Sequence, residues 1–266
     1  MKAEAPVEGY RKVVERGEMG LQYLEFGLIH LTDGEWSGAT AECEYALDIH
    51  SGVISLEIVS PGLDSYKRLG GRKDVFDDLP TVVYLPPNVQ YRITVDEGPA
   101  DIAVFSSIAK GFNGGSKIID PKDISVESHG RNNWRWEVHT AIGEKFFASK
   151  LLMGEALVPP GNWANIPPHK HDAFIPPREM LMEEIYYFKA TPVQGFGMMR
   201  IYTAPNDPGR MDEAFVIEDG DMVVIPRGYH PLVAAPGYSL NYTWAMAGNV
   251  RKYGAWTFDP RHDWIF

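Results

Sequence analysis

Two histidines separated by one residue, His169 and His171, are the side chains with the clearest chemistry in this sequence. On a β-strand, side chains two residues apart lie on the same face, so both imidazoles would point the same way. Pro167 and Pro168, directly before the pair, exclude a helix there and favour extended backbone. The pair therefore predicts one half of a metal site.

A third histidine and a carboxylate could complete that site. His230 follows an apolar run and a turn at 227–229, so it would open a new strand and could point into a barrel. Glu184 opens an apolar run in which strand pairing would fix its direction, while Glu179 and Glu183 are alternatives. Three imidazoles and one carboxylate suit a divalent cation such as zinc, manganese, iron or nickel, and they indicate a metalloenzyme or a descendant of one. The predicted metal ligands are His169, His171, Glu184 and His230.

Composition limits the classes of protein to consider. The 266 residues suffice for one large domain or two of ordinary size. A formal net charge of -11 argues against general electrostatic binding of nucleic acid, because phosphate contacts need clustered lysine and arginine. The sole cysteine, Cys43, excludes an intrachain disulfide and is typical of a reducing compartment. Because neither a membrane-spanning run nor a signal peptide is evident, we expect a cytoplasmic protein without membrane contact.

Short apolar runs, separated by many of the 26 glycines and 20 prolines, dominate the chain. Their β-branched and aromatic residues favour strands, and long helical periodicity is scarce. The pattern predicts an all-β chain built as sandwiches or barrels. Examples of such runs are 81–86, 102–105, 184–188 and 222–226.

The two halves of the chain are weakly similar to each other. A shift that aligns Glu44 with Glu184 also aligns residues 78–86 with residues 218–226. Such internal similarity predicts two related β-barrels, of which only the second keeps the ligands. The positions that correspond to the three histidines are held by Ile29, Leu31 and Gln90.

A domain boundary is expected in the polar, turn-rich stretch 113–133. We therefore predict an N-terminal barrel without metal ligands over residues 1–130. A C-terminal barrel over residues 131–266 would carry the metal site.

The ligand set, the many strands and the duplicated halves resemble the cupin superfamily, here as a bicupin with two similar jelly-roll β-barrels. The chain is more closely similar to the 5-deoxy-glucuronate isomerases of bacterial inositol catabolism. This resemblance is dense from about residue 153 to the C-terminus and thin before residue 130. The motifs that carry it are 161–172, 183–188, 194–197, 200–203, 220–231, 235–238, 246–248 and 264–265.

The sequence departs from these patterns at two places. A typical cupin has its glutamate a few residues after the second histidine, whereas a loop containing Pro176 and Pro177 separates His171 from Glu184. Residues 163–165 read Trp-Ala-Asn where the family pattern has Trp-Ser-Ser, so a hydroxyl role there is absent.

The resemblance implies an aldose-to-ketose isomerisation that converts 5-deoxy-D-glucuronate to 5-dehydro-2-deoxy-D-gluconate. A divalent cation would stabilise the enediolate as charge develops on its oxygen. A positioned base must move the proton, and several candidates stay open. They are Glu184, Glu183, Tyr186, Tyr202 and a metal-bound hydroxide.

The substrate's own carboxylate should need a cation in the protein. Arg200 is the first candidate, with Tyr202 beside it in sequence. Lys170 and Arg227 are further candidates, although Lys170 would alternate away from the histidine face and Arg227 lies in a turn.

Two other functions stay open. A cupin oxygenase would use the same ligands to hold iron or nickel, and a non-catalytic bicupin would only bind sugars. The expected partners are a small sugar acid and further copies of the chain, as a dimer or a larger homo-oligomer.

Overall fold

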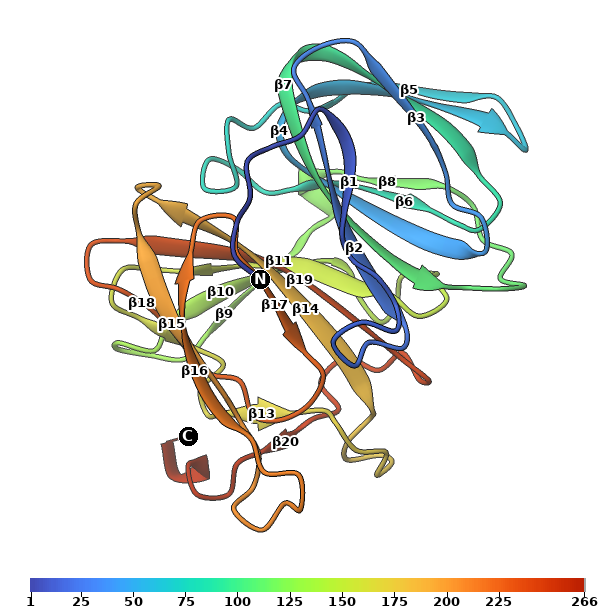
Figure 1. Cartoon of the computed structure of the whole chain (residues 1–266). Coiled ribbons are helices and arrows are strands. Elements are labelled where there is room, and N and C mark those ends of the chain that lie inside the picture. The colour runs from blue at the N-terminus through green and yellow to red at the C-terminus, as the bar shows by residue number, and fades with distance from the viewer. Residues whose placement is uncertain (266) are drawn as a thin grey trace. The chain divides into compact units, whose positions relative to one another are not determined.

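The computed structural model describes residues 1–265, which form an almost entirely antiparallel β structure (Figure 1). Within these residues the helical elements are two short 3-10 helices, and no helix is long and apolar enough to cross a membrane. The all-β class predicted from the apolar runs is confirmed.

Two compact units make up the chain, and their ranges interleave. The N-terminal unit comprises Ala5–Ile124 and Ala141–Met153. The C-terminal unit comprises Met1–Glu4, Ser125–Thr140 and the residues from Gly154 onward. A single boundary after residue 130 does not describe this division, because residues 141–153 return to the N-terminal unit.

One eight-stranded sheet forms the N-terminal unit. Its elements are β1 (Gly9–Val14), β2 (Leu24–Leu31), β3 (Glu35–Ala39), β4 (Cys43–Ser60), β5 (Asp64–Gly70), β6 (Thr81–Leu85), β7 (Gln90–Ile108), β8 (Lys117–Ile119) and η1 (Pro121–Asp123). The strand order is β1-β2-β7-β4-β6-β8, with β3 paired to β7 and β5 paired to β4. β8 and η1 lie in the stretch that the sequence predicted to be a connection.

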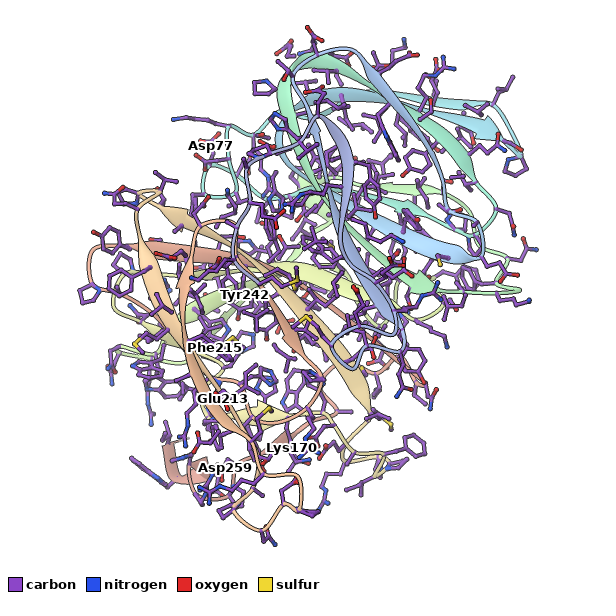
Figure 2. All side chains as sticks on the ribbon, in the orientation of Figure 1. Asp77, Lys170, Glu213, Phe215, Tyr242 and Asp259 are labelled. Atoms are coloured by element: carbon purple, nitrogen blue, oxygen red, sulfur yellow. The ribbon has the colours of Figure 1, made fainter. Side chains whose placement is uncertain are left out.

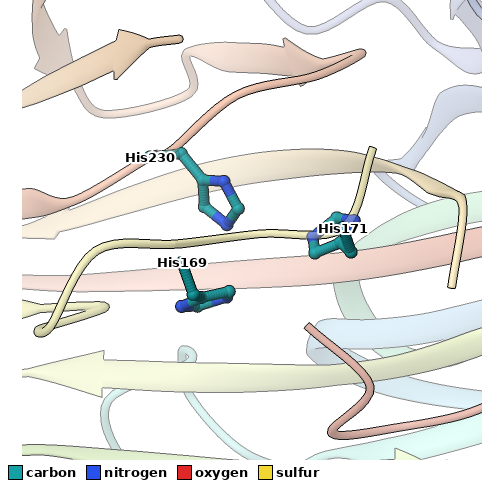
Figure 3. Close-up of side chains that lie close together, drawn as sticks. All are labelled: His169, His171 and His230. Atoms are coloured by element: carbon teal, nitrogen blue, oxygen red, sulfur yellow. The ribbon is translucent and has the colours of Figure 1, made fainter. Parts of the chain in front are cut away.

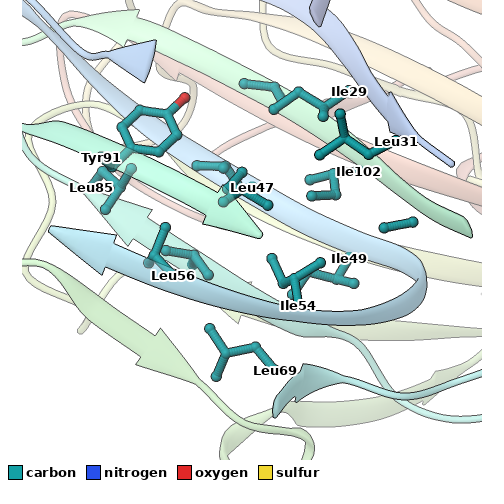
Figure 4. Packing of buried hydrophobic residues seen from close by; sticks show 14 of the residues in the cluster. Ile29, Leu31, Leu47, Ile49, Ile54, Leu56, Leu69, Leu85, Tyr91 and Ile102 are labelled. Carbon is teal, nitrogen blue, oxygen red and sulfur yellow. The ribbon is translucent and has the colours of Figure 1, made fainter. Parts of the chain in front are cut away.

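Aliphatic side chains fill the interior of this unit (Figure 4). Ile29 and Leu31 belong to the cluster and are almost completely buried. Gln90, at the start of β7, is exposed. The three positions aligned with the metal histidines therefore hold two core residues and one surface residue.

Glu44 on β4, which aligns with Glu184, is fully buried and hydrogen-bonded within the N-terminal unit. The Tyr84 hydroxyl donates to its carboxylate at 2.7 Å. The backbone N–H groups of Ser149, Lys150 and Leu151 donate at 2.7, 2.6 and 2.9 Å. These four donors occupy the acceptor sites of the carboxylate, so Glu44 anchors a loop.

Three sheets form the C-terminal unit. Its elements are β9 (Ser125–His129), β10 (Trp136–Ile142), β11 (Leu152–Val158), β12 (Trp163–Ala164), β13 (His169–Lys170), β14 (Met182–Thr191), β15 (Phe196–Tyr202), β16 (Asp212–Glu218), β17 (Met222–Ile225), β18 (Leu232–Ala234), β19 (Ser239–Gly248), β20 (Thr257–Phe258) and η2 (Asp263–Ile265). The sheet orders are β17-β14-β19-β11-β10-β9, β12-β18-β15-β16 and β13-β20.

These strands position the predicted ligands from three separate segments. β14 is an inner strand of the six-stranded sheet, and its pairing with β17 and β19 fixes the direction of Glu184. His169 opens β13 and is paired with Phe258 on β20. His230 lies between β17 and β18, next to a bridge between Tyr202 and Tyr229.

Candidate metal centre

The three histidines predicted as ligands lie together in the C-terminal unit (Figure 3). The ring nitrogens of His169, His171 and His230 that could bind an ion are all within 4.8 Å of one another. The ring of His169 is 4.7 Å from that of His230, measured between centroids, and the ring of His171 is 5.3 Å from it. Strand β13, the residue that follows it and a turn distant in sequence thus bring three imidazoles together.

The carboxylate of Glu184 adjoins the same point. Its Oε2 atom lies 3.1 Å from Nε2 of His171 and 3.4 Å from Nε2 of His230. All three side chains are almost completely buried. The structure therefore brings together all four residues that the sequence predicted to be ligands.

Backbone carbonyls hold two of the rings in the orientation that metal binding needs. The Nδ1–H of His171 can donate to the Met182 carbonyl at 2.7 Å, and that of His230 to the Gly228 carbonyl at 2.9 Å. Each such bond leaves the lone pair of Nε2 facing the centre. Among residues 1–265, Nε2 of His230 is buried without a hydrogen-bond partner. This donor set fits a divalent cation of the zinc, manganese, iron or nickel type.

The electrostatics of the cluster also suit a metal site. Burial, with a further contribution from the neighbouring imidazoles, lowers the pKa of His169 well below its usual 6.5. Burial lowers the pKa of His230 to about 4. Both rings are therefore neutral at pH 7, as ligation requires. Burial opposes the charged form of His171 too, but the Glu184 carboxylate raises the pKa of that ring.

A cavity of about 390 Å³ adjoins the centre, a size that suits a small ligand. Trp256, which lines it, lies 4.8 Å from the ring of His169. Aromatic rings make up much of the wall, and most polar groups are grouped near the centre. The lining residues are His129, Gly130, Arg131, Trp134, Trp136, Val138, Asn165, Ile166, Pro167, His169, Glu184, Tyr186, Tyr242, Trp244, Met246, Tyr253, Trp256 and Phe258.

Asn165 connects several of these polar groups. Its Nδ2 atom donates to the Tyr186 hydroxyl at 3.1 Å and to the His230 carbonyl at 3.2 Å. Its Oδ1 atom accepts from the Tyr242 hydroxyl at 3.3 Å. Asn165 has a φ of 58°, in the left-handed region that asparagine tolerates better than most residues. The departure from Trp-Ser-Ser thus places an amide where the family pattern has a hydroxyl.

Arg200 and Tyr202 were predicted to bind the substrate, but both side chains are bound to carboxylates of the protein. The Arg200 guanidinium forms a two-point ion pair with Asp212, at 2.7 and 2.9 Å, and lies over the ring of Tyr202. The Tyr202 hydroxyl donates to Asp259 at 2.8 Å. In the described chain neither side chain lines the cavity.

Lys170 and Arg227 also have carboxylate partners of their own. Lys170 forms ion pairs with Asp172 and Glu179 (Figure 2 labels Lys170). Arg227 is paired with Asp207 at 2.7 Å. Neither is a lining residue within the described chain.

Sequence reasoning missed the basic end of the cavity. Arg131, His129 and Trp134 line it, although the sequence assigned residues 113–133 to a connection between domains. The available signal was the aromatic-rich run at 134–136, which begins three residues after Arg131. Of the lysines and arginines in residues 1–265, only Arg131 lines the cavity.

The all-β architecture and the buried centre of three imidazoles and one carboxylate define a protein of cupin-like fold. An oxalate decarboxylase from Lactobacillus farciminis has this fold, with a TM-score of 0.63 at 14% identity over 96% of this chain and 85% of that chain. The sequence pattern of the KduI/IolB family matches residues 3–265, and the chain belongs to this family. The membership predicted from the motifs is confirmed.

Relatives in this family are similar over nearly the whole chain. The 5-deoxy-glucuronate isomerase of Geobacillus kaustophilus is 36% identical over 252 residues, covering 93% of this chain and 87% of that protein. The protein of the same name from Listeria innocua is 34% identical over 257 residues, covering 95% and 90%. The crystal structure of an IolB-like protein from Salmonella typhimurium LT2 has a TM-score of 0.91 at 28% identity, over 99% of this chain and 98% of that one.

Proposed function

We propose that the chain is a 5-deoxy-glucuronate isomerase, which converts 5-deoxy-D-glucuronate to 5-dehydro-2-deoxy-D-gluconate. The observation that carries this proposal is the buried centre of three histidines and Glu184, which opens into a cavity of small-molecule size. The similarity of the chain to isomerases over more than nine tenths of its length supports the same reaction. Its cytoplasmic location and homo-oligomeric state stay predictions from the sequence.

The chemistry asks for two hydrogen transfers within one molecule. One hydrogen moves as a proton from C2 to C1, and the proton of the C2 hydroxyl moves to the C1 oxygen. The aldehyde is reduced and the alcohol is oxidised, so no outside oxidant or reductant takes part. The protein must therefore hold the first two carbons beside a proton carrier and stabilise negative charge on their oxygens.

A divalent cation held by His169, His171, His230 and Glu184 would supply Lewis-acid polarisation of the two substrate oxygens. Elemental analysis would identify it among zinc, manganese, iron and nickel, since the donor set suits each of them.

Glu184 and Tyr186 are the proton-carrying oxygens of the cavity that lie next to the imidazoles. Tyr186 accepts a hydrogen bond from Asn165 and lies two residues after Glu184 on β14, hence on the same face of the strand. Burial, with the charge of Glu184 beside it, raises the pKa of the Tyr186 phenol well above its usual 10, so it stays protonated. We assign the transfer between C2 and C1 to the Glu184 carboxylate and donation to a substrate oxygen to Tyr186.

The test combines elemental analysis of the purified protein with an assay on 5-deoxy-glucuronate in the absence of oxygen. Formation of the ketose with a stoichiometric divalent metal supports the isomerase. Consumption of the sugar acid only when oxygen is present would establish the oxygenase alternative. A metal-free protein whose thermal stability does not change on adding manganese or zinc would instead support a non-catalytic sugar-binding protein.

A further inference from the structure

We infer that Arg131 binds the carboxylate of the substrate and thereby sets the direction in which the sugar acid lies in the cavity. This inference rests on the proposed function, because it concerns the far end of the same substrate. Of the lysines and arginines in residues 1–265, Arg131 is the one that lines the cavity.

Two contacts within residues 1–265 orient the Arg131 guanidinium. It lies over the ring of Trp134, 5.6 Å from the ring centroid, and one of its terminal nitrogens donates to the Ile265 carbonyl at 3.0 Å. No ion pair joins it to a carboxylate within residues 1–265, unlike Arg200, Lys170 and Arg227. A guanidinium has five N–H donors, so a planar carboxylate can still be bound at two points.

Neighbouring groups favour an anion at this end of the cavity. His129 also lines it and is stacked on Trp136, and its Nε2 atom is buried without a hydrogen-bond partner among residues 1–265. Glu127, whose side chain is largely exposed, lies 3.6 Å from that nitrogen. At the opposite end of the cavity, Glu184 and the imidazoles are the groups assigned above to the cation, which would take the aldehyde and hydroxyl oxygens.

The two ends of the cavity therefore select one orientation of the substrate. The aldehyde and the C2 hydroxyl lie beside Glu184 and the imidazoles, and the carboxylate lies beside Arg131. Between them the wall consists mainly of aromatic rings, which suit the unsubstituted methylene at C5 better than a hydroxylated carbon.

The experiment compares Arg131→Ala with Arg131→Lys and with the control Arg135→Ala. Arg135 is an exposed arginine of the same loop that does not line the cavity. Each protein is assayed with 5-deoxy-glucuronate and with 5-deoxy-glucose, in which a neutral hydroxymethyl group replaces the carboxylate. We expect Arg131→Ala to lower kcat/KM for the acid by about 10- to 100-fold, mainly through KM, with little change for the neutral sugar. Arg131→Lys should recover part of the loss, and Arg135→Ala should match wild type.

If Arg131→Ala lowered kcat/KM equally for both sugars, Arg131 would serve only to hold the chain at Ile265. That result would overturn the inference and leave the isomerase function standing. Unchanged kcat/KM for the acid in Arg131→Ala would overturn it in the same way. A wild-type protein that does not convert 5-deoxy-glucuronate would overturn the proposed function, and this inference with it.

Discussion

The ring of His171 is held at both of its nitrogens. The Nδ1–H donates to the Met182 carbonyl, and Nε2 lies 3.1 Å from Oε2 of Glu184. Loss of a residue that only hydrogen-bonds a metal ligand lowers metal affinity by up to about 100-fold. Because His171→Ala removes a ligand itself, it should lower metal affinity by more than that. Turnover should fall in parallel, because the remaining donors are two imidazoles and one carboxylate. The measurements are the metal-to-protein ratio after dialysis and the rate of ketose formation.

The control for this variant is His30→Ala, which removes a partly exposed histidine of the N-terminal unit that lies outside the cavity. Far-ultraviolet circular dichroism should be unchanged in both variants. A His171→Ala protein with full metal content and normal turnover would remove His171 from the centre.

Asn165 offers a second test at the scale of one residue, because its amide and its backbone can be probed separately. Asn165→Gly deletes the hydrogen bonds to Tyr186 and His230 but accepts the φ of 58° without strain. Asn165→Ala deletes the same bonds and adds about 1 kcal/mol of backbone strain. Both variants should therefore lower kcat by about tenfold, corresponding to one lost hydrogen bond, and Asn165→Ala should also be less stable.

The measurements are kcat and the free energy of unfolding in urea. The double variant Asn165→Gly, Tyr186→Phe should lose less kcat, expressed as free energy of activation, than the sum of the losses in the two single variants, because both changes act at the same hydroxyl. Additive losses would show that Asn165 does not act through Tyr186.

Single residues also show where prediction from the sequence ends. His169 and His171 are two residues apart, and on extended backbone such side chains lie on the same face. It could therefore be predicted from the sequence that both imidazoles point the same way. The partner of an arginine depends instead on which strand lies beside it. Arg200 meets Asp212 because β15 and β16 pair in one particular register, which no local spacing shows. Arg131 could not be selected because its place at the cavity depends on how residues 125–140 pack in the C-terminal unit.

At the scale of the element, β13 depends on β20. The Asp259 N–H donates to the Pro168 carbonyl, directly before His169. The Asp259 carboxylate is buried and accepts from the Tyr202 hydroxyl and from Arg261 (Figure 2 labels Asp259). Asp259 thus holds β20 against the strand that carries the first metal ligand.

Asp259→Asn should loosen this pairing, because the amide keeps an acceptor for Tyr202 but loses the charge that pairs with Arg261. We expect stability at pH 7 to fall by about 1 to 2 kcal/mol and a chelator to remove the metal faster than from wild type. The control is Asp263→Ala, which changes an exposed carboxylate in η2. A chelation rate equal to that of wild type would show that β20 does not support the centre.

The same variant has a defined pH dependence. Burial alone would raise the pKa of Asp259, but hydrogen bonds from Arg261 and Tyr202 lower it to about 2. A lowered pKa contributes stability that is present above the unfolded value of 3.8 and is lost as the pH falls toward about 2. The stability difference between wild type and Asp259→Asn should therefore shrink over that interval, as measured by urea unfolding at several pH values.

Elements differ in how well the sequence indicates them. β14, β17 and the other apolar strands could be predicted from their β-branched and aromatic residues. β13 and β20 have two residues each and show no periodic pattern. Their pairing joins His169 to Phe258 across most of the C-terminal unit's sequence, so it follows only from the folded structure.

On the scale of the whole molecule, the four predicted ligands lie in the C-terminal unit, whereas the positions aligned with two of them, Ile29 and Leu31, lie in the N-terminal unit. Those positions pack in an aliphatic core, and Glu44 is saturated by four hydrogen-bond donors. The interleaved ranges of the units could not be predicted, because residues 141–153 show no change in composition that marks their return.

The aliphatic core gives the N-terminal unit a structural role that can be separated from catalysis. Leu47 is fully buried in that core (Figure 4), whereas Leu63, between β4 and β5, is 88% exposed. Leu47→Ala should lower the free energy of unfolding by about 2 to 5 kcal/mol because it leaves a cavity, and Leu63→Ala should have almost no effect. All residues that line the active cavity belong to the C-terminal unit, so kcat and metal content of folded Leu47→Ala should equal those of wild type. Urea unfolding, elemental analysis and turnover well below the melting temperature measure these quantities. A folded Leu47→Ala protein with reduced kcat would show that the packing of the N-terminal unit also shapes the reaction.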